Sequence, residues 1–349
     1  MKAVVVSGAR QLRVTEVEAS APAAGEVGVA VTGCGICGSN LHEWRHPEQR
    51  ISSTVEMVPG INGHEVTGRV QAVGAGVELA LGTRVVIEPN LAQACGRCDP
   101  CRGGTAWFCT DRRTMANWGF AQVMNVPEEA VFVLPDDLDD AVGTLVEPLA
   151  CTVHGLRGTA RALAGGDDLA GATVAIVGAG VAGLLALRAA AHLGAGRLVS
   201  VARHDHQAQA AEALGADIVI DAGAADLRGQ LRARAPDVVV EAVGGRADTF
   251  DLAIHAVAPA GEVVVLGLFE EPQTLNTRRA VFRGLRVSFP VTYGRRAGVH
   301  DFTHAIAALR ATPTAARLVS HTFSLDDVDA AFHCADDKTA GVLRVVVTP

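Results

Sequence analysis

Residues 173–183 read Thr-Val-Ala-Ile-Val-Gly-Ala-Gly-Val-Ala-Gly, and this stretch decides the fold of the middle of the chain. Its first five residues are typical of a strand buried on both faces of a parallel sheet. The glycines then follow the pattern Gly-x-Gly-x-x-Gly: Gly178 makes the tight turn, Gly180 lets a pyrophosphate approach the backbone, and Gly183 lets helix pack on strand. A helix beginning at Val181 would also offer free N–H groups to phosphates. We therefore predict a dinucleotide site at these four residues.

The chain after this stretch alternates between strand-like and helical runs. Such alternation predicts an α/β domain with a doubly wound parallel sheet, the Rossmann arrangement, over residues 153–286. The expected strands are 173–177, 198–202, 217–220, 237–240, 262–266 and 285–289, and the expected helices include 181–193, 207–214 and 248–257.

The two ends of the chain have a different character. Residues 1–152 carry short β-branched runs broken by glycine and proline, without a long amphipathic helix, which predicts a β-rich, barrel-like unit. The chain also finishes in a strand-like run, so we expect residues 1–152 and 287–349 to form one domain into which the sheet domain is inserted. The expected strands of this domain are 2–6, 26–32, 65–73, 83–88, 121–126 and 342–347.

Composition limits the classes of partner. The chain has 349 residues, of which 49% are hydrophobic and 19% charged, as expected of a folding globular protein. Its net charge is −8 and no basic cluster follows any segment, so nucleic acid and anionic membrane are poor partner predictions. The longest uncharged apolar stretch, residues 172–187, is too short to span a bilayer. We find no secretion signal, and cysteines with metal-type spacing favour a reducing cytoplasm.

Four cysteines lie close together within residues 90–112, at Cys95, Cys98, Cys101 and Cys109. Their thiolates can surround one tetrahedral ion, and a closed set of four suits a structural zinc. Two disulfides in so tight a loop would strain each other, and the spacing fits iron–sulfur clusters poorly. We therefore predict a structural zinc lobe.

A second possible metal site comes from two short pieces of sequence. Residues 34–42 read Cys-Gly-Ile-Cys-Gly-Ser-Asn-Leu-His, and residues 63–65 read Gly-His-Glu. A thiolate, an imidazole and a carboxylate together make an open zinc site with room for a substrate oxygen. Cys34 and Cys37 could instead form a thioredoxin-like redox pair.

The end of the second expected strand bears on which dinucleotide binds. An NAD site usually places an acid there to bind the ribose 2′-hydroxyl, whereas this chain has Ala202, Arg203 and His204. The guanidinium of Arg203 could pair with a 2′-phosphate, so we predict a preference for NADP(H). The alternative is that Arg203 is a solvated surface residue and Asp205 serves as the acid.

With these pieces in order, the chain resembles the zinc-dependent medium-chain alcohol dehydrogenases. The resemblance includes Cys-Gly-Ile-Cys-Gly-Ser, Gly-His-Glu, the cysteine lobe, Glu-Pro-Leu at 147–149 and the glycine pattern, in that sequence order. The Pro89-Asn90 lead into the lobe and Glu-Pro-Leu look closest to the polyol, threonine and butanediol dehydrogenase branch. The resemblance implies a GroES-like β-barrel for the β-rich domain.

The resemblance also implies roles for individual residues. Cys37, His64 and Glu147 would surround the catalytic zinc, the first of two zinc ions per chain. Glu65 would be a fourth or exchangeable ligand, or else a buried carboxylate that tethers the site. Ser39 would hydrogen-bond the substrate oxygen and His42 would carry its proton towards solvent.

One departure from the family is Asn40, where the family nearly always has aspartate as a partner for the zinc-bound histidine. Asn40 can still accept a hydrogen bond through its amide oxygen but brings no negative charge. We expect a more electrophilic, less tightly held zinc.

The activity implied is hydride transfer between NADP(H) and a secondary alcohol or ketone of polyol, cyclitol or natural-product type, by a homodimer or homotetramer. The alternatives are an NAD-dependent polyol or amino-alcohol dehydrogenase, a zinc-independent quinone or enoyl reductase, and a non-catalytic protein that binds zinc and nucleotide. The expected pocket residues are Glu43, Trp44, Trp118, Phe120 and Tyr293, with Trp44 and Trp118 equally suited to the barrel core.

Overall fold

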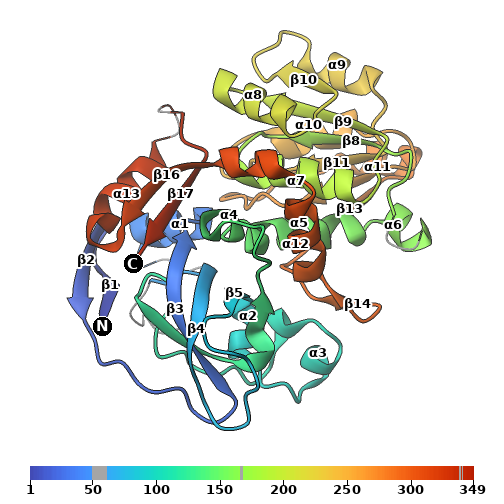
Figure 1. Cartoon of the computed structure of the whole chain (residues 1–349). Helices are drawn as coiled ribbons and strands as arrows, with labels where there is room; N and C mark the ends of the chain where they lie inside the picture. Colours follow the sequence, from blue (N-terminus) through green and yellow to red (C-terminus); the bar gives the residue numbers. More distant parts are fainter. Residues whose placement is uncertain (49–60, 166–167, 338, 340) are drawn as a thin grey trace. The chain divides into compact units, whose positions relative to one another are not determined.

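The computed structural model describes residues 1–48, 61–165, 168–337, 339 and 341–349. These residues form two compact units (Figure 1). The first comprises Met1–Glu147, Gly294–Gly298 and Ala316–Pro349, and the second comprises Pro148–Tyr293 and Val299–Ala315. Within the described residues, no helix has the length and apolar character needed to cross a membrane.

The second unit contains the parallel sheet that the sequence predicts. Its strand order in the described part of the chain is β10-β9-β8-β11-β12-β13, and every neighbouring pair is parallel. The central strands are almost wholly apolar and buried, because helices cover a sheet of this kind on both faces. The strands are β8 (Thr173–Val177), β9 (Arg197–Ala202), β10 (Ile218–Asp221), β11 (Val238–Glu241), β12 (Glu262–Val265) and β13 (Arg286–Ser288). The helices are α5 (Val146–Arg157), α6 (Ala160–Gly165), α7 (Val181–His192), α8 (Asp205–Ala213), α9 (Leu227–Ala233), α10 (Thr249–Ala256), α11 (Thr277–Arg283) and α12 (Asp301–Arg310).

Strand order places the carboxyl ends of β8, β9 and β11 next to one another. β8 is the earliest strand and lies between β9 and β11, so the order reverses at its edge. Ligands of open α/β sheets bind outside the carboxyl ends of strands at such a reversal. The glycine-rich turn that follows β8 lies there.

The first unit is built on a mixed sheet that also takes in the end of the chain: β16 and β17 are parallel, and the other neighbouring pairs are antiparallel. Its main order is β16-β17-β3-β4-β5-β7, with β6 paired to β3. The strands of this sheet are β3 (Glu26–Gly35), β4 (Glu65–Val73), β5 (Arg84–Ile87), β6 (Val123–Pro127), β7 (Val131–Val133), β16 (Val319–Ser324) and β17 (Arg344–Thr348). β1 (Lys2–Gly8) and β2 (Gln11–Glu16) form a separate two-stranded antiparallel sheet. The helices that bear on the sites are α1 (Gly38–Arg45), α2 (Pro89–Gln93), α3 (Asp99–Arg102), α4 (Asp140–Gly143) and α13 (Val328–Asp336).

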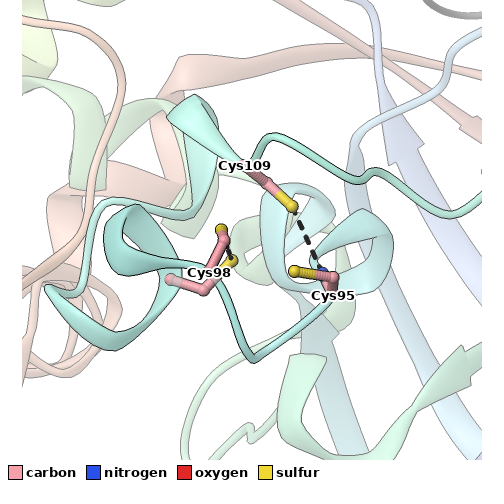
Figure 2. Close-up of side chains that lie close together, drawn as sticks. Cys95, Cys98 and Cys109 are labelled. Carbon is pink, nitrogen blue, oxygen red and sulfur yellow. Dashed lines mark hydrogen bonds between the residues drawn. The ribbon is translucent and has the colours of Figure 1, made fainter.

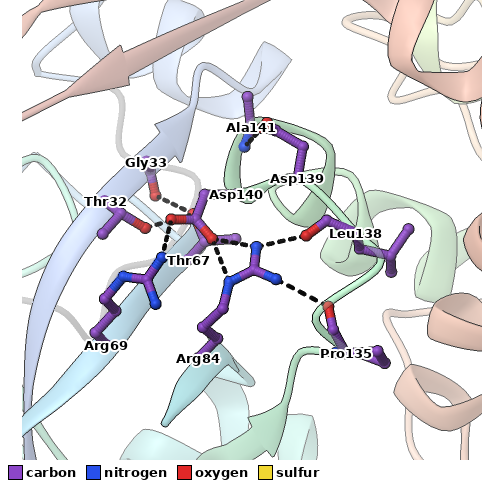
Figure 3. A network of polar contacts seen from close by, with 10 residues as sticks. All are labelled: Thr32, Gly33, Thr67, Arg69, Arg84, Pro135, Leu138, Asp139, Asp140 and Ala141. Carbon is purple, nitrogen blue, oxygen red and sulfur yellow. Dashed lines mark hydrogen bonds and ion pairs between the residues drawn. The ribbon is translucent and has the colours of Figure 1, made fainter. Parts of the chain in front are cut away.

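A polar network fixes the segment that leads from β7 towards α5 (Figure 3). The Arg84 guanidinium forms an ion pair with Asp140 at the start of α4 and donates hydrogen bonds to the carbonyl oxygens of Pro135 and Leu138. Arg69 lies 3.6 Å from the same carboxylate. Because both arginines come from neighbouring strands, the network ties α4 to the sheet just before the chain reaches Glu147.

Candidate functional site

Helix α1 carries three of the predicted catalytic residues. Cys37 is its N-cap, in an extended conformation, and β3 ends two residues earlier. Ser39 lies in the first helical turn and His42 lies three residues further, so the two face the same side of the helix. Both side chains are half-buried.

The start of β4 supplies the other groups of the site. His64 directly precedes β4 and Glu65 is its first residue. Cys37, His64 and Glu65 each contribute one possible ligand atom, and these three atoms lie within 4.8 Å of one another. Three donors thus surround a common point. The glutamate is fully buried, and its Oε1 has no hydrogen-bond partner among the described residues.

The electrostatics of this cluster suit a divalent cation. Burial would lower the pKa of His64, but the hydrogen bond and charge of Cys37 and the charges of Glu147 and Glu65 outweigh it and raise that pKa well above its usual value. Crowded anionic donors with an orphaned buried carboxylate oxygen are the surroundings that zinc satisfies. By contrast, burial raises the pKa of the Cys34 thiol, which lies buried in β3. Cys34 is therefore poorly suited to a redox pair with Cys37.

Arg344 is a site residue that the sequence argument missed. It is the first residue of β17, and its Nη2 lies 2.6 Å from Glu65 Oε2, with side chains 5% and 0% exposed. Its Nη1 donates to the Ile36 carbonyl oxygen at 2.6 Å. Burial would lower the pKa of Arg344, but the charge and hydrogen bond of Glu65, together with the charges of Cys37 and Glu147, outweigh it and raise that pKa. In the sequence, the one feature that could have drawn attention to Arg344 is its position directly before three valines of a strand-like run.

The charge of one further carboxylate, Glu147, acts on the cluster, and a second carboxylate, Glu88, interacts with Glu147. Glu147 is buried in the first turn of α5, and its charge acts on His64 and Arg344, although the three-donor group does not include it. Glu88 is the N-cap of α2 and accepts a hydrogen bond from Leu91 N. Burial, assisted by the Glu147 charge, raises the pKa of Glu88 to about 8. Glu88 was not among the site residues predicted from the sequence.

Asn40 accepts a hydrogen bond through its amide oxygen, as expected, but the donor is not the His64 ring. Its amide oxygen accepts a hydrogen bond from Cys37 N at 2.9 Å. His64 Nδ1 instead lies 2.7 Å from the backbone oxygen of Asn62. The histidine is thus held by the main chain.

The four cysteines of the lobe come together as their spacing predicts (Figure 2). One sulfur atom from each lies within 4.8 Å of the others, and none of the eight cysteines, all of which are described, forms a disulfide. Hydrogen bonds from the backbone of Thr110 and Cys101 lower the pKa of Cys98 to about 6, whereas burial raises that of Cys101 to about 12. Four thiols this close cannot all ionise without a cation, so the lobe fits a closed tetrahedral metal site.

The glycine-rich turn of the second unit has the geometry of a phosphate cradle. Gly178 has φ +101°, which favours glycine, and a Cβ at Gly183 would lie 1.8 Å from the Gly178 oxygen. A Cβ at Gly180, by contrast, would meet open space, and Val181 begins α7 there. The backbone is therefore accessible to a pyrophosphate at the helix N-terminus.

The end of β9 holds the residues predicted to select the dinucleotide. Ala202 is buried as the last residue of the strand, Arg203 is exposed, and His204 is the N-cap of α8. The His204 ring stacks on that of His206, with centroids 5.5 Å apart and an 11° angle between planes. His206 was not anticipated; its position two residues after His204 was the available signal.

Several residues expected in a substrate pocket pack in the core. Trp44, Trp118 and Phe120 are at most 2% exposed and belong to the barrel cluster. Tyr293 is buried against Phe302 in the second unit. Glu43 is also buried, and Asn62 Nδ2 donates to it at 3.4 Å.

Comparisons with known proteins agree with this geometry. The alcohol dehydrogenase GroES-like domain matches residues 23–136, and the zinc-binding dehydrogenase domain matches residues 181–311. An L-threonine 3-dehydrogenase from Anaeromyxobacter sp. (strain K) is 30% identical over 88% of this chain and 87% of its own length. A sorbitol dehydrogenase from Bacillus subtilis (strain 168) is 31% identical over 77% and 75%. The crystal structure of a zinc-binding dehydrogenase from Sinorhizobium meliloti 1021, bound to NADP, is 29% identical over 100% of this chain and 99% of that one, with a TM-score of 0.81.

Both matched domains occur in the expected order, and the whole fold is shared with the Sinorhizobium meliloti structure. The chain therefore belongs to the zinc-dependent medium-chain dehydrogenases, in the branch of the polyol, threonine and butanediol dehydrogenases, and is an alcohol dehydrogenase that uses zinc and a nicotinamide cofactor.

Proposed function

We propose that the enzyme transfers hydride between NADP(H) and a secondary alcohol or ketone of polyol, cyclitol or natural-product type. The observation that carries this proposal is the convergence of Cys37, His64 and Glu65 beside the helix that bears Ser39. The names of the threonine and sorbitol dehydrogenase relatives support a substrate with neighbouring polar groups. We further propose two zinc ions per chain, a homodimer or homotetramer, and a reducing cytoplasm as the location.

In the first site, Cys37 and His64 would hold zinc, with Glu147 as a third ligand and Glu65 as an exchangeable one. Zinc bound there supplies a Lewis acid for the substrate oxygen, and the dinucleotide supplies or accepts the hydride. The second ion would be held by Cys95, Cys98, Cys101 and Cys109, where no position remains for substrate.

Ser39 and His42 would transfer the proton between the substrate and solvent. The Ser39 hydroxyl would accept a hydrogen bond from the substrate hydroxyl and donate its own proton to a nitrogen of the His42 imidazole. The two residues lie one turn apart on α1, which favours such a transfer. In the reductive direction the same groups return the proton to the carbonyl oxygen.

Preference for the phosphorylated dinucleotide rests on the end of β9. Ala202 presents no charge to a 2′-phosphate, and exposed Arg203 can pair with it bidentately. His204, the N-cap of α8, lies at the same end, with its ring stacked on that of His206. In the alternative hypothesis of an NAD-dependent enzyme, Asp205, the first residue of α8, would bind the ribose 2′-hydroxyl.

The test is steady-state turnover of zinc-loaded enzyme against a panel of polyols, cyclitols and ketones, with both dinucleotides in parallel. We expect kcat/KM at least ~10-fold higher with NADP(H), loss of turnover with a zinc chelator, and ~10²–10³-fold lower kcat in Ser39→Ala or His42→Ala. The Cys37→Ser variant should lose one zinc and the activity together. A higher kcat/KM with NAD(H) would establish the NAD-dependent alternative, and chelator-resistant turnover would refute the zinc role.

A further inference from the structure

Asn40 has an environment that distinguishes its amide nitrogen from its amide oxygen. The side chain is fully buried in the first turn of α1. Its Nδ2 donates to the carbonyl oxygen of Asn62 at 3.0 Å and to that of Ile61 at 3.4 Å. Its Oδ1 accepts from Cys37 N, so the orientation of the amide is fixed from both ends. A carboxylate could replace the acceptor but not the donor.

The two carbonyl groups that Asn40 binds belong to a strained turn. Ile61 has φ +40° and Asn62 has φ +50°, so two consecutive residues with side chains adopt left-handed conformations. The left-handed region is unfavourable for residues that carry a side chain, and a β-branched isoleucine is among the least suited to it. Asn62 Nδ2 also donates to Glu43 Oε1 at 3.4 Å, which gives a second link from the turn to α1. Helix α1 therefore holds the turn in place.

One backbone oxygen of the strained turn contacts His64, the proposed zinc ligand. The Asn62 carbonyl oxygen lies 2.7 Å from His64 Nδ1. A carbonyl oxygen only accepts, so Nδ1 carries the proton and Nε2 is left as the ligand atom. The same oxygen thus receives hydrogen bonds from both His64 and Asn40.

We propose that Asn40 is a positioning residue for the zinc ligand His64, and that it acts as a hydrogen-bond donor through the Asn62 carbonyl. Asn40 Nδ2 restrains that carbonyl, and the carbonyl fixes the tautomer and the ring orientation of His64. This inference rests on the proposed zinc site. It assigns to the amide a function that an aspartate could not perform here, because a carboxylate at this position would lie against two carbonyl oxygens and repel both.

The decisive variant is Asn40→Asp, which keeps the size and the acceptor of the side chain and removes the donor. We expect the zinc dissociation constant of the His64 site to rise at least ~10-fold, the usual effect of losing a group that orients a metal ligand. The visible absorption spectrum of the cobalt-substituted site should change as well, since the His64 ring loses its fixed orientation. A His64→Ala variant identifies the part of each signal that belongs to this site and not to the cysteine lobe.

Asn117→Asp provides a matched control in the same unit. Asn117 is 6% exposed, and its Nδ2 likewise donates to two backbone carbonyl oxygens, at Trp118 and Val123. This change should lower the Tm without altering zinc affinity or the cobalt spectrum. Should Asn40→Asp not fold, Asn40→Ser replaces it: the hydroxyl can serve the nearby Cys37 N–H but is too short to bind the turn.

The outcomes distinguish failure of the positioning role of Asn40 from failure of the proposed zinc site. The positioning role would be overturned, with the zinc site left intact, if Asn40→Asp had the zinc affinity and the cobalt spectrum of the parent. Tighter zinc binding in Asn40→Asp than in the parent would have the same meaning. Equal metal content in the parent and in His64→Ala would overturn the zinc assignment itself and the positioning role with it. An equal loss of zinc affinity in Asn117→Asp would show that general destabilisation, and not the donor at Asn40, is responsible.

Discussion

The buried ion pair between Arg344 and Glu65 should stabilise the metal-free protein more than the zinc-loaded protein. Arg344→Met keeps an unbranched stem of similar length and removes the charge. Coulomb's law at 2.6 Å with an effective dielectric constant of about 20 gives an attraction of about 6 kcal/mol, from which desolvation must be subtracted. Breaking such a buried pair from one side typically costs about 3–5 kcal/mol. We expect that loss in the metal-free enzyme, which includes the hydrogen bond to the Ile36 carbonyl oxygen.

Zinc should reduce the loss, because an ion among Cys37, His64 and Glu65 supplies positive charge in place of the guanidinium. The assay is urea unfolding of parent and variant, metal-free and zinc-loaded, at one fixed protein concentration. The Arg344→Met/Glu65→Gln double variant should regain part of the stability, since it no longer buries an uncompensated carboxylate. Equal losses with and without zinc, together with no recovery in the double variant, would refute this reasoning.

Three further predictions follow from other parts of the structure. Because the pKa of Glu88 is raised from 4.5 to about 8, the folded state binds this proton more tightly, and parent stability should fall as pH rises between those values. Glu88→Gln can still accept the hydrogen bond from Leu91 N but does not titrate. Its free energy of unfolding relative to the parent, measured by denaturant titration, should therefore rise by about 2–4 kcal/mol between pH 5 and pH 8.5. Parallel pH profiles of stability in the two proteins would contradict the raised pKa. Arg203→Ala should raise the KM for NADP ~10-fold or more with little change for NAD, and Ala202→Asp should shift preference towards NAD; unchanged kinetics with both cofactors would exclude this end of β9 from recognition. Cys98→Ser should release one zinc per chain, measured by metal analysis, and lower the Tm while Co²⁺ still binds at the His64 site; full zinc retention would count against the lobe as a metal site.

Much of the fold could be predicted from local pattern. The run at 173–177 followed by three spaced glycines predicted a strand, a turn and a helix, and β8 and α7 confirm them. The strands at the chain ends also appear, because alternating β-branched residues specify a half-buried strand from short-range information. The four cysteines of the lobe lie within fifteen residues, so their spacing already fixed that they could meet.

The remaining site residues depended on contacts between distant segments. Arg344 lies 308 residues from Ile36, whose carbonyl oxygen it binds, and it reaches Glu65 only because β17 and β4 both pair with β3. Likewise, the departure at Asn40 was visible in the sequence, which indicated only an acceptor without charge. The structure shows that the amide accepts from Cys37 N and also donates to the Ile61–Asn62 turn.

Sequence by itself therefore determined which residues could supply strands, a phosphate-binding turn and metal ligands, because those properties depend on residue type and short spacing. Tertiary structure alone decided which charge neutralises Glu65 and which atom orients His64. The physical reason is that burial and hydrogen-bond polarity are properties of the folded surroundings. A carboxylate or an amide has the same chemistry in any sequence, but its partner is chosen by the strands and turns packed against it.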